Sequence, residues 1–386
     1  MKNSTTPWKD ERWLPGVLNK AQMISLMDAQ LIIGAKMDID EDASALDLHL
    51  SSEGYRMKQG SIKPFNKSYR DIITDTIYAE ILPKESDGSF LLEKEQCYLF
   101  KIKEKLHPYI KQSPIYGQAT AKSTVGRVDV IARLIVDGMK EYEKFNPKDI
   151  DKSGEIFLEI TPINFNVKVK EGISISQLRF FNGEIENSII QDKEFIKSVL
   201  NLPDNDPNDG YLSVDISNTT LPNGHLAAAL RASKKKDNPP IELWGQDKYN
   251  PFDYWIPVAS KEEDNLKSIV INKNQFYILR SKERISLPAG CCIYCRAMDE
   301  TLGEMRIHYA GFVHPLFGVD RPDGKHGTPL IFEVRGHNVE ILLTHNEILA
   351  RLFFYRMSNE AGTGTASYNN QDLTLSKFFK KEWTSN

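Results

Sequence analysis

The sequence predicts a mainly β protein built from two tandem barrel or jelly-roll repeats with a few short helices. Three observations predict this fold: the length of 386 residues, a diverged internal repeat, and short runs that alternate apolar and polar residues between turn residues. The length is roughly twice a common domain size, so two hydrophobic cores are expected. With 40% hydrophobic and 26% charged residues, the composition is that of an ordinary globular chain.

The internal repeat consists of five pairs of segments that follow one another in the same order. The pairs are 46–50 with 213–217, 92–99 with 271–278, 124–127 with 301–304, 156–160 with 330–334, and 177–181 with 351–355. They predict an N-terminal extension at 1–44, a first repeat at 45–200, a second repeat at 211–358, and a C-terminal lid or tail at 359–386. The breaker-rich stretch 201–210 is predicted to link the repeats.

Strand patterns dominate both repeats. The segments 157–181 and 330–354 alternate apolar and polar positions, with Gly, Pro or Asn between the runs. Such spacing is typical of a barrel or jelly roll. Helical patterns are confined to 20–33, 138–145 and 224–233, and these three segments are the expected helices.

Charge and hydropathy exclude several classes of protein. The formal net charge is −4, so no general electrostatic attraction to a nucleic-acid duplex is expected. No run reaches the ~18 apolar residues that a membrane-spanning helix needs, and the first residues lack the apolar core of a signal peptide. We therefore expect a cytoplasmic protein that binds neither nucleic acid nor membrane.

Three of the four cysteines, Cys291, Cys292 and Cys295, crowd into one predicted strand. This spacing suits no disulfide framework, and we expect reduced, buried thiols. Cys292 and Cys295 could supply half of a zinc site, but no second pair of ligands follows nearby. His345-Asn346-Glu347 resembles the first half of the zinc deaminase signature, but the required Cys pair does not follow it.

Two kinds of polar position could carry chemistry. The run from Lys122 to Arg127, which includes Ser123 and Thr124, concentrates cations and hydroxyls that can bind phosphate oxygens, although a surface turn has the same composition. Glu159 and Glu333 each lie in an apolar strand pattern. On a solvent face such a Glu has no catalytic role, whereas in a pocket desolvation would raise the pKa of its carboxyl and allow proton transfer.

The order of the motifs resembles that of the dCTP deaminase and dUTPase superfamily. Matching segments are 121–127, 154–159 and 172–180, followed in the second repeat by 309–315 and in the tail by 368–371. The layout is similar to the long, internally duplicated form of dCTP deaminase, and the likeness covers about residues 45–375. It implies two dUTPase-like repeats and hydrolytic deamination of dCTP to dUTP and ammonia, within the metabolism that supplies dUTP and dTTP.

The resemblance also implies site residues. Glu159 would be the proton shuttle, with Ser123 and Arg127 supporting the base and the attacking water. The residues implied to bind substrate are Lys122, Thr124, Gln177, Ala310, Gly311, Tyr368 and Gln371. Mg²⁺ would accompany the triphosphate, no zinc or other protein-bound metal would be needed, and dTTP is a candidate inhibitor.

The second repeat departs from the pattern, because Glu300 and Glu304 lie where the first repeat has Ser123 and Arg127. Two acids there would repel phosphate, so Glu333 is either a relic or a member of a composite site. We expect composite sites, one per chain, where a first repeat meets a second repeat. Self-association into trimers or hexamers is expected.

Two alternatives remain open. A dUTP pyrophosphatase of the same fold, or a bifunctional enzyme, could use Asp137 to activate water. A non-catalytic nucleotide-binding regulatory protein would bind nucleotides without turnover. The products formed from dCTP and dUTP separate these possibilities.

Overall fold

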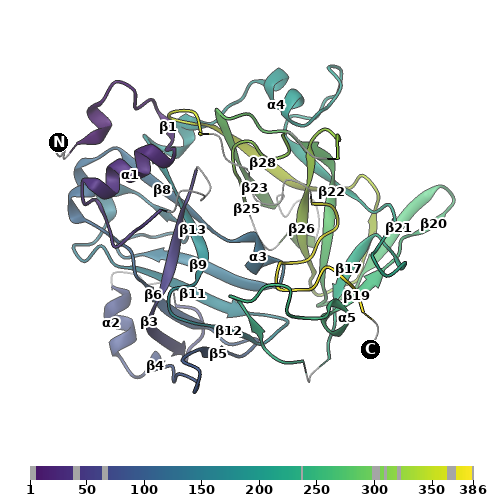
Figure 1. Ribbon diagram of the computed structural model, residues 1–386, viewed down its shortest axis with the longest axis horizontal. Helices are drawn as coiled ribbons and strands as arrows, with labels where there is room; N and C mark the ends of the chain where they lie inside the picture. Colours follow the sequence, from purple (N-terminus) through teal and green to yellow (C-terminus); the bar gives the residue numbers. More distant parts are fainter. Residues whose placement is uncertain are drawn as a thin grey trace.

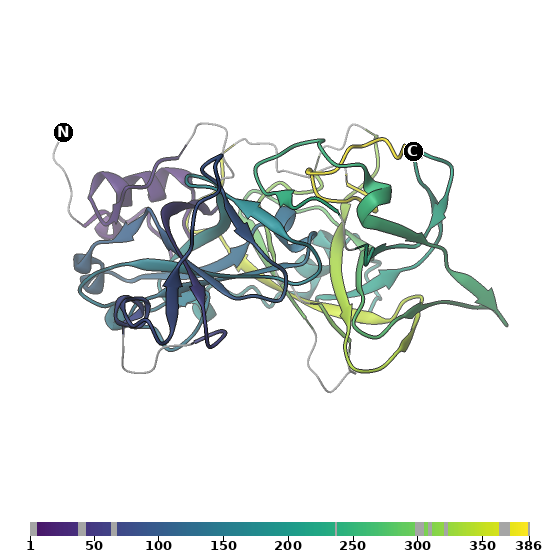
Figure 2. The same cartoon turned by 90° about the horizontal axis from the view of Figure 1, so that it is seen from below.

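The computed structural model describes residues 6–37, 44–62, 68–235, 238–297, 305–307, 311–319, 323–362 and 371–384. Two β-sheets, each curled into a barrel-like half, lie side by side along the long axis of the molecule (Figures 1 and 2). The first half is drawn in purple to teal and the second in green to yellow. The predicted fold class, two tandem β repeats with few helices, is confirmed.

The main sheet of the first half has the strand order β10-β8-β13-β3-β6-β11-β9, with β1 paired to β13 and β4 paired to β3. Its strands are β1 (Gly16–Val17), β3 (Leu46–Met57), β4 (Ala79–Ile81), β6 (Tyr98–Ile102), β8 (Ile115–Ala121), β9 (Val130–Val136), β10 (Lys144–Phe145), β11 (Ile156–Pro162) and β13 (Ser174–Asn182).

The main sheet of the second half has the order β19-β17-β22-β14-β28-β23-β25, with β26 paired to β22 and β24. Its strands are β14 (Tyr211–Asp215), β17 (Ala229–Ala232), β19 (Trp255–Val258), β22 (Phe276–Ile285), β23 (Cys291–Ala297), β24 (Met305–Ile307), β25 (Gly311–Val313), β26 (Thr328–Gly336) and β28 (Ile348–Arg356).

The pairing pattern shows that the two halves are copies of one fold. The neighbours β8-β13-β3-β6-β11 correspond to β23-β28-β14-β22, with β26 beside β22. Even the register is kept: Glu159 lies opposite Leu99, and Glu333 lies opposite Ile278. The sequence repeat had matched both pairs of positions, so Glu159 and Glu333 are structurally equivalent.

Smaller elements complete the fold. The remaining strands are β2 (Ile32–Ile33), β5 (Phe90–Leu92), β7 (Lys105–Leu106), β12 (Val167–Val169), β15 (Thr219–Thr220), β16 (Leu226–Ala227), β18 (Ile241–Glu242), β20 (Lys261–Glu263), β21 (Leu266–Ile271) and β27 (Ile341–Thr344). The α-helices are α1 (Lys20–Asp28), α2 (Tyr69–Thr74), α3 (Ser123–Gly126), α4 (Lys193–Val199) and α5 (Pro251–Tyr254), and short 3₁₀ turns span Pro7–Lys9, Pro108–Gln112, Pro147–Asp149 and Ile185–Ser188.

One of the three expected helices forms. In α1, Asn19 and Gln22 make a capping box, and the helix ends at Asp28 rather than at residue 33. The prediction for 138–145 is wrong, because Gly138 and Glu143 adopt positive φ and the segment turns into β10. The prediction for 224–233 is also wrong, because β17 is hydrogen-bonded between β22 and β19.

The second half reaches into the first through β18, which pairs in parallel with β12, Ile241 opposite Val167. Residues 200–210 connect α4 to β14 without regular structure, where a linker was predicted. The four cysteines are free and buried, three of them on β23, as expected. Among the described helices, none is long and apolar enough to cross a membrane.

Candidate functional site

The polar run of the first repeat forms a turn at the boundary between the halves. The strand β8 ends at Ala121, Lys122 is the N-cap of α3, and Arg127 ends the helix. Val125 and Gly126 are buried and anchor the turn, while the side chains of Ser123 and Thr124 are only half-buried. In Figure 1, α3 lies between the first half and β26 of the second half.

The C-terminal tail fixes this turn to the second half. Buried Arg127 donates one hydrogen bond to Gln371 Oε1 and another, of 3.3 Å, to the carbonyl of Thr374. Gln371 in turn donates a 2.9 Å hydrogen bond to the carbonyl of Pro329 on β26, the strand that carries Glu333. The predicted contact residue Gln371 therefore joins the Ser/Arg turn to the second repeat, whereas Tyr368 lies outside the described residues.

The strand β26 directs alternate side chains toward the two halves. Phe332 and Val334 point into the core of the second half, whereas Ile331 packs against the core of the first. Because side chains alternate along a strand, Glu333 shares the face of Ile331 and points toward the first half. The second repeat thus presents its carboxylate to the turn of the first repeat.

The surroundings of Glu333 suit a group that exchanges protons. The residue is 6% exposed, and desolvation raises the pKa of its carboxyl to about 8. The nearby Arg127 guanidinium lowers this pKa, and Asp129 raises it. The backbone of Glu333 itself hydrogen-bonds the carboxylate, and no described side chain donates a hydrogen bond to it.

The segment expected to cover the base lies beside the same carboxylate. Gly311 in β25 pairs with Cys295 of β23, and the Glu333 charge helps to raise the pKa of the Cys295 thiol to about 12, although burial contributes more. Buried Arg179 of the first half donates to the carbonyls of Ile293 and Val313, at 3.0 and 3.4 Å. Ala310 lies outside the described residues, as do Glu300 and Glu304.

The remaining predicted phosphate contacts lie on the first half. The Lys122 ammonium forms an ion pair with Asp47. Gln177 is buried in β13, where it pairs with Asp47 on one side and Thr120 on the other. Burial, and after it the nearby Lys122 ammonium, lower the pKa of Lys377 in the tail. Two lysines therefore flank the side of the turn that follows β8.

Glu159 lies in a different environment from the turn. Leu158 and Ile160 point into the core, so Glu159 points to the outer face of β11. Its carboxylate accepts a 2.7 Å hydrogen bond from Ser61 Oγ and a 3.4 Å bond from Tyr142 OH. Burial raises the pKa of the Glu159 carboxyl. None of the described contacts joins Glu159 to Ser123 or Arg127 within this chain.

Asp137, the candidate base of the pyrophosphatase alternative, belongs to the same outer region as Glu159. Its Oδ1 accepts a 2.9 Å hydrogen bond from the backbone of Tyr69, while its buried Oδ2 has no partner among the described residues. Burial raises the pKa of the Asp137 carboxyl to about 6. Burial, and then the charges of Glu159 and Asp137, raise the pKa of Tyr69, so the structure groups Asp137 with Glu159, whereas Arg127 acts on Glu333.

Two charged residues at the boundary carried no motif in the sequence. Asp129, two residues after Arg127, forms an ion pair with Arg335, two residues after Glu333. Arg335 lies two residues after Glu333, so strand alternation could have placed both side chains on the same face from the sequence alone. Ser61 and Tyr142, which bind Glu159, lie in loops whose sequence gives no such signal.

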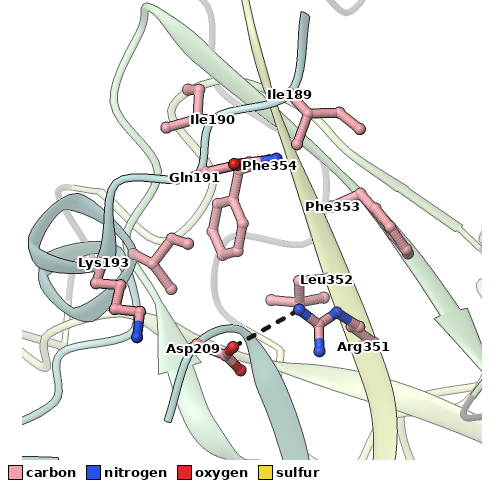
Figure 3. A pocket seen from close by; sticks show the side chains of 10 residues that line it. Ile189, Ile190, Gln191, Lys193, Asp209, Arg351, Leu352, Phe353 and Phe354 are labelled. Carbon is pink, nitrogen blue, oxygen red and sulfur yellow. Dashed lines mark ion pairs between the residues drawn. The ribbon is translucent and has the colours of Figure 1, made fainter. Parts of the chain in front are cut away.

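A cavity of about 340 Å³ lies elsewhere, between the segment before α4 and β28 (Figure 3). It is lined by Ile189, Ile190, Phe353 and Phe354, with an ion pair between Arg351 and Asp209 at its rim, 3.7 Å apart. It contains none of the predicted site residues. Across the ranges that the structure describes, no three His, Cys, Asp or Glu side chains gather as metal ligands.

Comparison with known proteins covers both halves. The family model for the 2'-deoxycytidine 5'-triphosphate deaminase N-terminal domain matches residues 14–184, and that for the C-terminal domain matches residues 189–379. The crystal structure of 2'-deoxycytidine 5'-triphosphate deaminase from Agrobacterium tumefaciens is similar, with a TM-score of 0.77 and 24% identity over 90% of this chain and 97% of that chain.

An oxalate decarboxylase structure aligns with a TM-score of only 0.12 and 10% identity, over 86% of this chain and 81% of that chain, and carries no argument. No curated protein sequence matches the chain significantly.

Proposed function

Because the chain belongs to the dCTP deaminase family, we propose that it hydrolyses dCTP to dUTP and ammonia at the boundary between its two halves. The observation that carries this proposal is the joining of the Arg127 turn to the second repeat, through Gln371 to Pro329 and through Asp129 to Arg335, which brings Arg127 near enough to Glu333 to lower the pKa of its carboxyl. The site is then composite, as the split of motifs between the repeats led us to expect. Both repeats contribute to it within one chain.

We assign the proton shuttle to Glu333 rather than to its equivalent Glu159. Glu333 is buried, faces Arg127 and receives no hydrogen bond from a described side chain. Glu159 is already bound by Ser61 and Tyr142 on an outer face. A carboxylate that moves protons must contact water and the base, and the turn with Ser123 and Arg127 lies beside Glu333.

The reaction can be written with these groups. The Glu333 carboxylate takes a proton from water while the water oxygen bonds to C4 of cytosine, and it passes that proton to N3. In the second stage the proton of the new hydroxyl moves to the amino nitrogen, the C4–N bond breaks, and ammonia leaves as the C4 carbonyl and the N3–H of uracil remain. Arg127 and Ser123 orient the water and the carboxylate.

The triphosphate would lie beside residues that the first repeat contributes to the site. Lys122 and Gln177 are close to the turn, and Thr124 belongs to it. Gln371, which now bonds Arg127 and Pro329, and Tyr368 from the same tail would meet the phosphates, while Ala310 and Gly311 would cover the base. Mg²⁺ would arrive with the triphosphate as part of the substrate.

The finer properties of the enzyme follow the same proposal. We expect a zinc-independent hydrolase that acts in the cytoplasm and supplies dUTP for deoxynucleotide synthesis. We also expect the protein to associate into trimers or hexamers and to be inhibited by dTTP.

The test is the identity of the products. Purified protein incubated with dCTP should release ammonia and accumulate dUTP, without pyrophosphate. Release of pyrophosphate from dUTP would show the pyrophosphatase or bifunctional alternative, and Asp137→Asn would then be the variant to test. Binding of dCTP without either product would contradict the enzyme and support a regulatory role.

A further inference from the structure

A buried ion pair connects the two halves immediately beside the proposed site. Asp129 follows the turn of the first repeat, Arg335 lies on β26 of the second, and the guanidinium contacts the Asp129 carboxylate. The side chains are 1% and 12% exposed, respectively. Asn164 also donates to Asp129, at 2.7 Å. An ion pair this deeply buried is sensitive to removal of either partner.

The pair stands in register with the two proposed catalytic groups. Arg127 and Asp129 are two residues apart on the first repeat, and Glu333 and Arg335 are two residues apart on one face of β26. Cation therefore faces anion twice across the boundary. The Asp129–Arg335 ion pair therefore joins the halves two residues along from the proposed catalytic groups on each side.

The backbone makes Asp129 a rigid end of this contact. Its φ of 57° lies in the left-handed region, which Gly, Asn and Asp adopt more readily than other residues. Its amide donates to the carbonyl of Gly126 at 2.9 Å, and its carbonyl accepts from Ile163 at 2.9 Å. The carboxylate is thus fixed both to the turn that carries Arg127 and to the end of β11.

We propose that Asp129 and Arg335 are positioning residues that hold Arg127 of one repeat against Glu333 of the other. This inference rests on the proposed function, since it concerns the same site, but it assigns a role to two residues that no motif indicated. Neither residue needs to touch the substrate. Their effect is exerted through the alignment of the catalytic pair and through their charges.

The proposal has an electrostatic signature. Among the described residues, the charged or titratable groups that act on Glu333 are Arg127 and Asp129 from the first half and Cys295 on β23, and Arg335 on its own strand pairs with Asp129. Removing the Asp129 charge leaves Arg335 unbalanced, which lowers the pKa of the Glu333 carboxyl. Removing the Arg335 charge leaves Asp129 unbalanced, which raises it.

Four variants test the role: Asp129→Asn, Arg335→Gln, the double variant, and Glu155→Gln as a control. Asn suits the left-handed backbone at 129, so the first change removes mainly charge. The control breaks a partly buried ion pair distant from the turn, between Glu155 and Arg70 at 2.9 Å. The measurements are ammonia release against pH, dCTP binding, and the infrared carbonyl band of a protonated carboxyl, assigned to Glu333 by its loss in Glu333→Gln.

Each single variant should lower kcat on the order of 10–100-fold, with a smaller change in KM, because misaligned groups lose mainly transition-state stabilisation. The limb of the pH profile and the infrared titration should move down in Asp129→Asn and up in Arg335→Gln, each by about one pH unit. In the double variant the shifts should largely cancel. The control should leave both unchanged.

Shifts in the same direction, or shifts no larger than in Glu155→Gln, would overturn the positioning role. Failure of the proposed function is distinguishable, because it would show as absent ammonia release in the unmodified protein. In that case the infrared titration of Glu333 still reports whether Asp129 and Arg335 act on it in opposite directions.

Discussion

Glu159 and Glu333 occupy the same place in two copies of one fold, yet their surroundings differ. In the first half, Ser61 in the segment between β3 and β4 donates a hydrogen bond to Glu159 on β11. In the second half, the equivalent segment between β17 and β19 crosses to the first half, where Ile241 pairs with Val167. Glu333 is consequently left facing the turn of the first repeat. Duplication has thus produced one carboxylate held by its own half and one that faces a neighbour.

The largest expected effect comes from replacing the arginine near each carboxylate and comparing the losses in kcat/KM. Arg127→Ala should lower kcat/KM for dCTP by about 10³-fold, because it removes a preorganised cation from the site. The matched change is Arg133→Ala, since exposed Arg133 lies opposite Glu159 on β9. It should cost less than about tenfold.

Steady-state kinetics on both proteins checks this expectation, with thermal unfolding to show that each is folded. Arg127→Lys, which keeps the charge, should recover part of the loss. Equal losses at the two positions would remove the distinction between the halves.

The pH dependence of kcat/KM should show the pKa of Glu333. A base acts when deprotonated, and kcat/KM reports the free enzyme, so the rate should rise about tenfold per pH unit below 8 and level off above it. The same profile is expected in Glu159→Gln. A rate that stays constant between about pH 6 and pH 9 would exclude Glu333 as the base.

Metal requirements should distinguish a counter-ion from a catalytic metal. Because Mg²⁺ is proposed to come with the triphosphate, its removal should raise KM several-fold and change kcat less. Phenanthroline should leave both unchanged. Stoichiometric zinc in active protein, measured by metal analysis, would contradict the zinc-independent reaction at either carboxylate.

The smallest expected effect is on stability. The Glu333 carboxyl has a pKa of about 8 in the folded chain and ~4.3 in the unfolded chain, so between these values unfolding releases its proton. Its contribution to the free energy of unfolding is therefore fully present below ~4.3 and is lost as the pH rises through 8. Glu333→Gln should therefore raise the Tm by a few degrees above pH 8 and leave it unchanged near pH 4. Calorimetry at both pH values measures this.

Glu159→Gln should raise the Tm above pH 8 by less, because hydrogen bonds from Ser61 and Tyr142 offset part of the rise in the Glu159 pKa that burial causes. A larger increase there would reverse the assignment of the two carboxylates.

The sequence predicted the duplicated fold and a composite site between the repeats, and its resemblance to the family assigned the proton shuttle to Glu159, where we propose Glu333. Strand alternation and the repeat placed Glu159 and Glu333 at equivalent positions, and both lie among similar apolar neighbours. Which carboxylate is hydrogen-bonded within its own half depends on the segments between β3 and β4 and between β17 and β19, whose sequences contain no shared motif. The helix expected at 224–233 failed for a related reason, because strand pairing in β17 overrode local propensity.

The most direct measurement compares Glu333→Gln with Glu159→Gln in ammonia release from saturating dCTP. The change keeps the shape of each side chain and removes its ability to transfer protons. Glu333→Gln should lose about 10³-fold or more in kcat while dCTP binding changes little, and Glu159→Gln should retain at least about a third of the rate. The opposite outcome, loss in Glu159→Gln with Glu333→Gln active, would contradict the account and restore the sequence-based assignment.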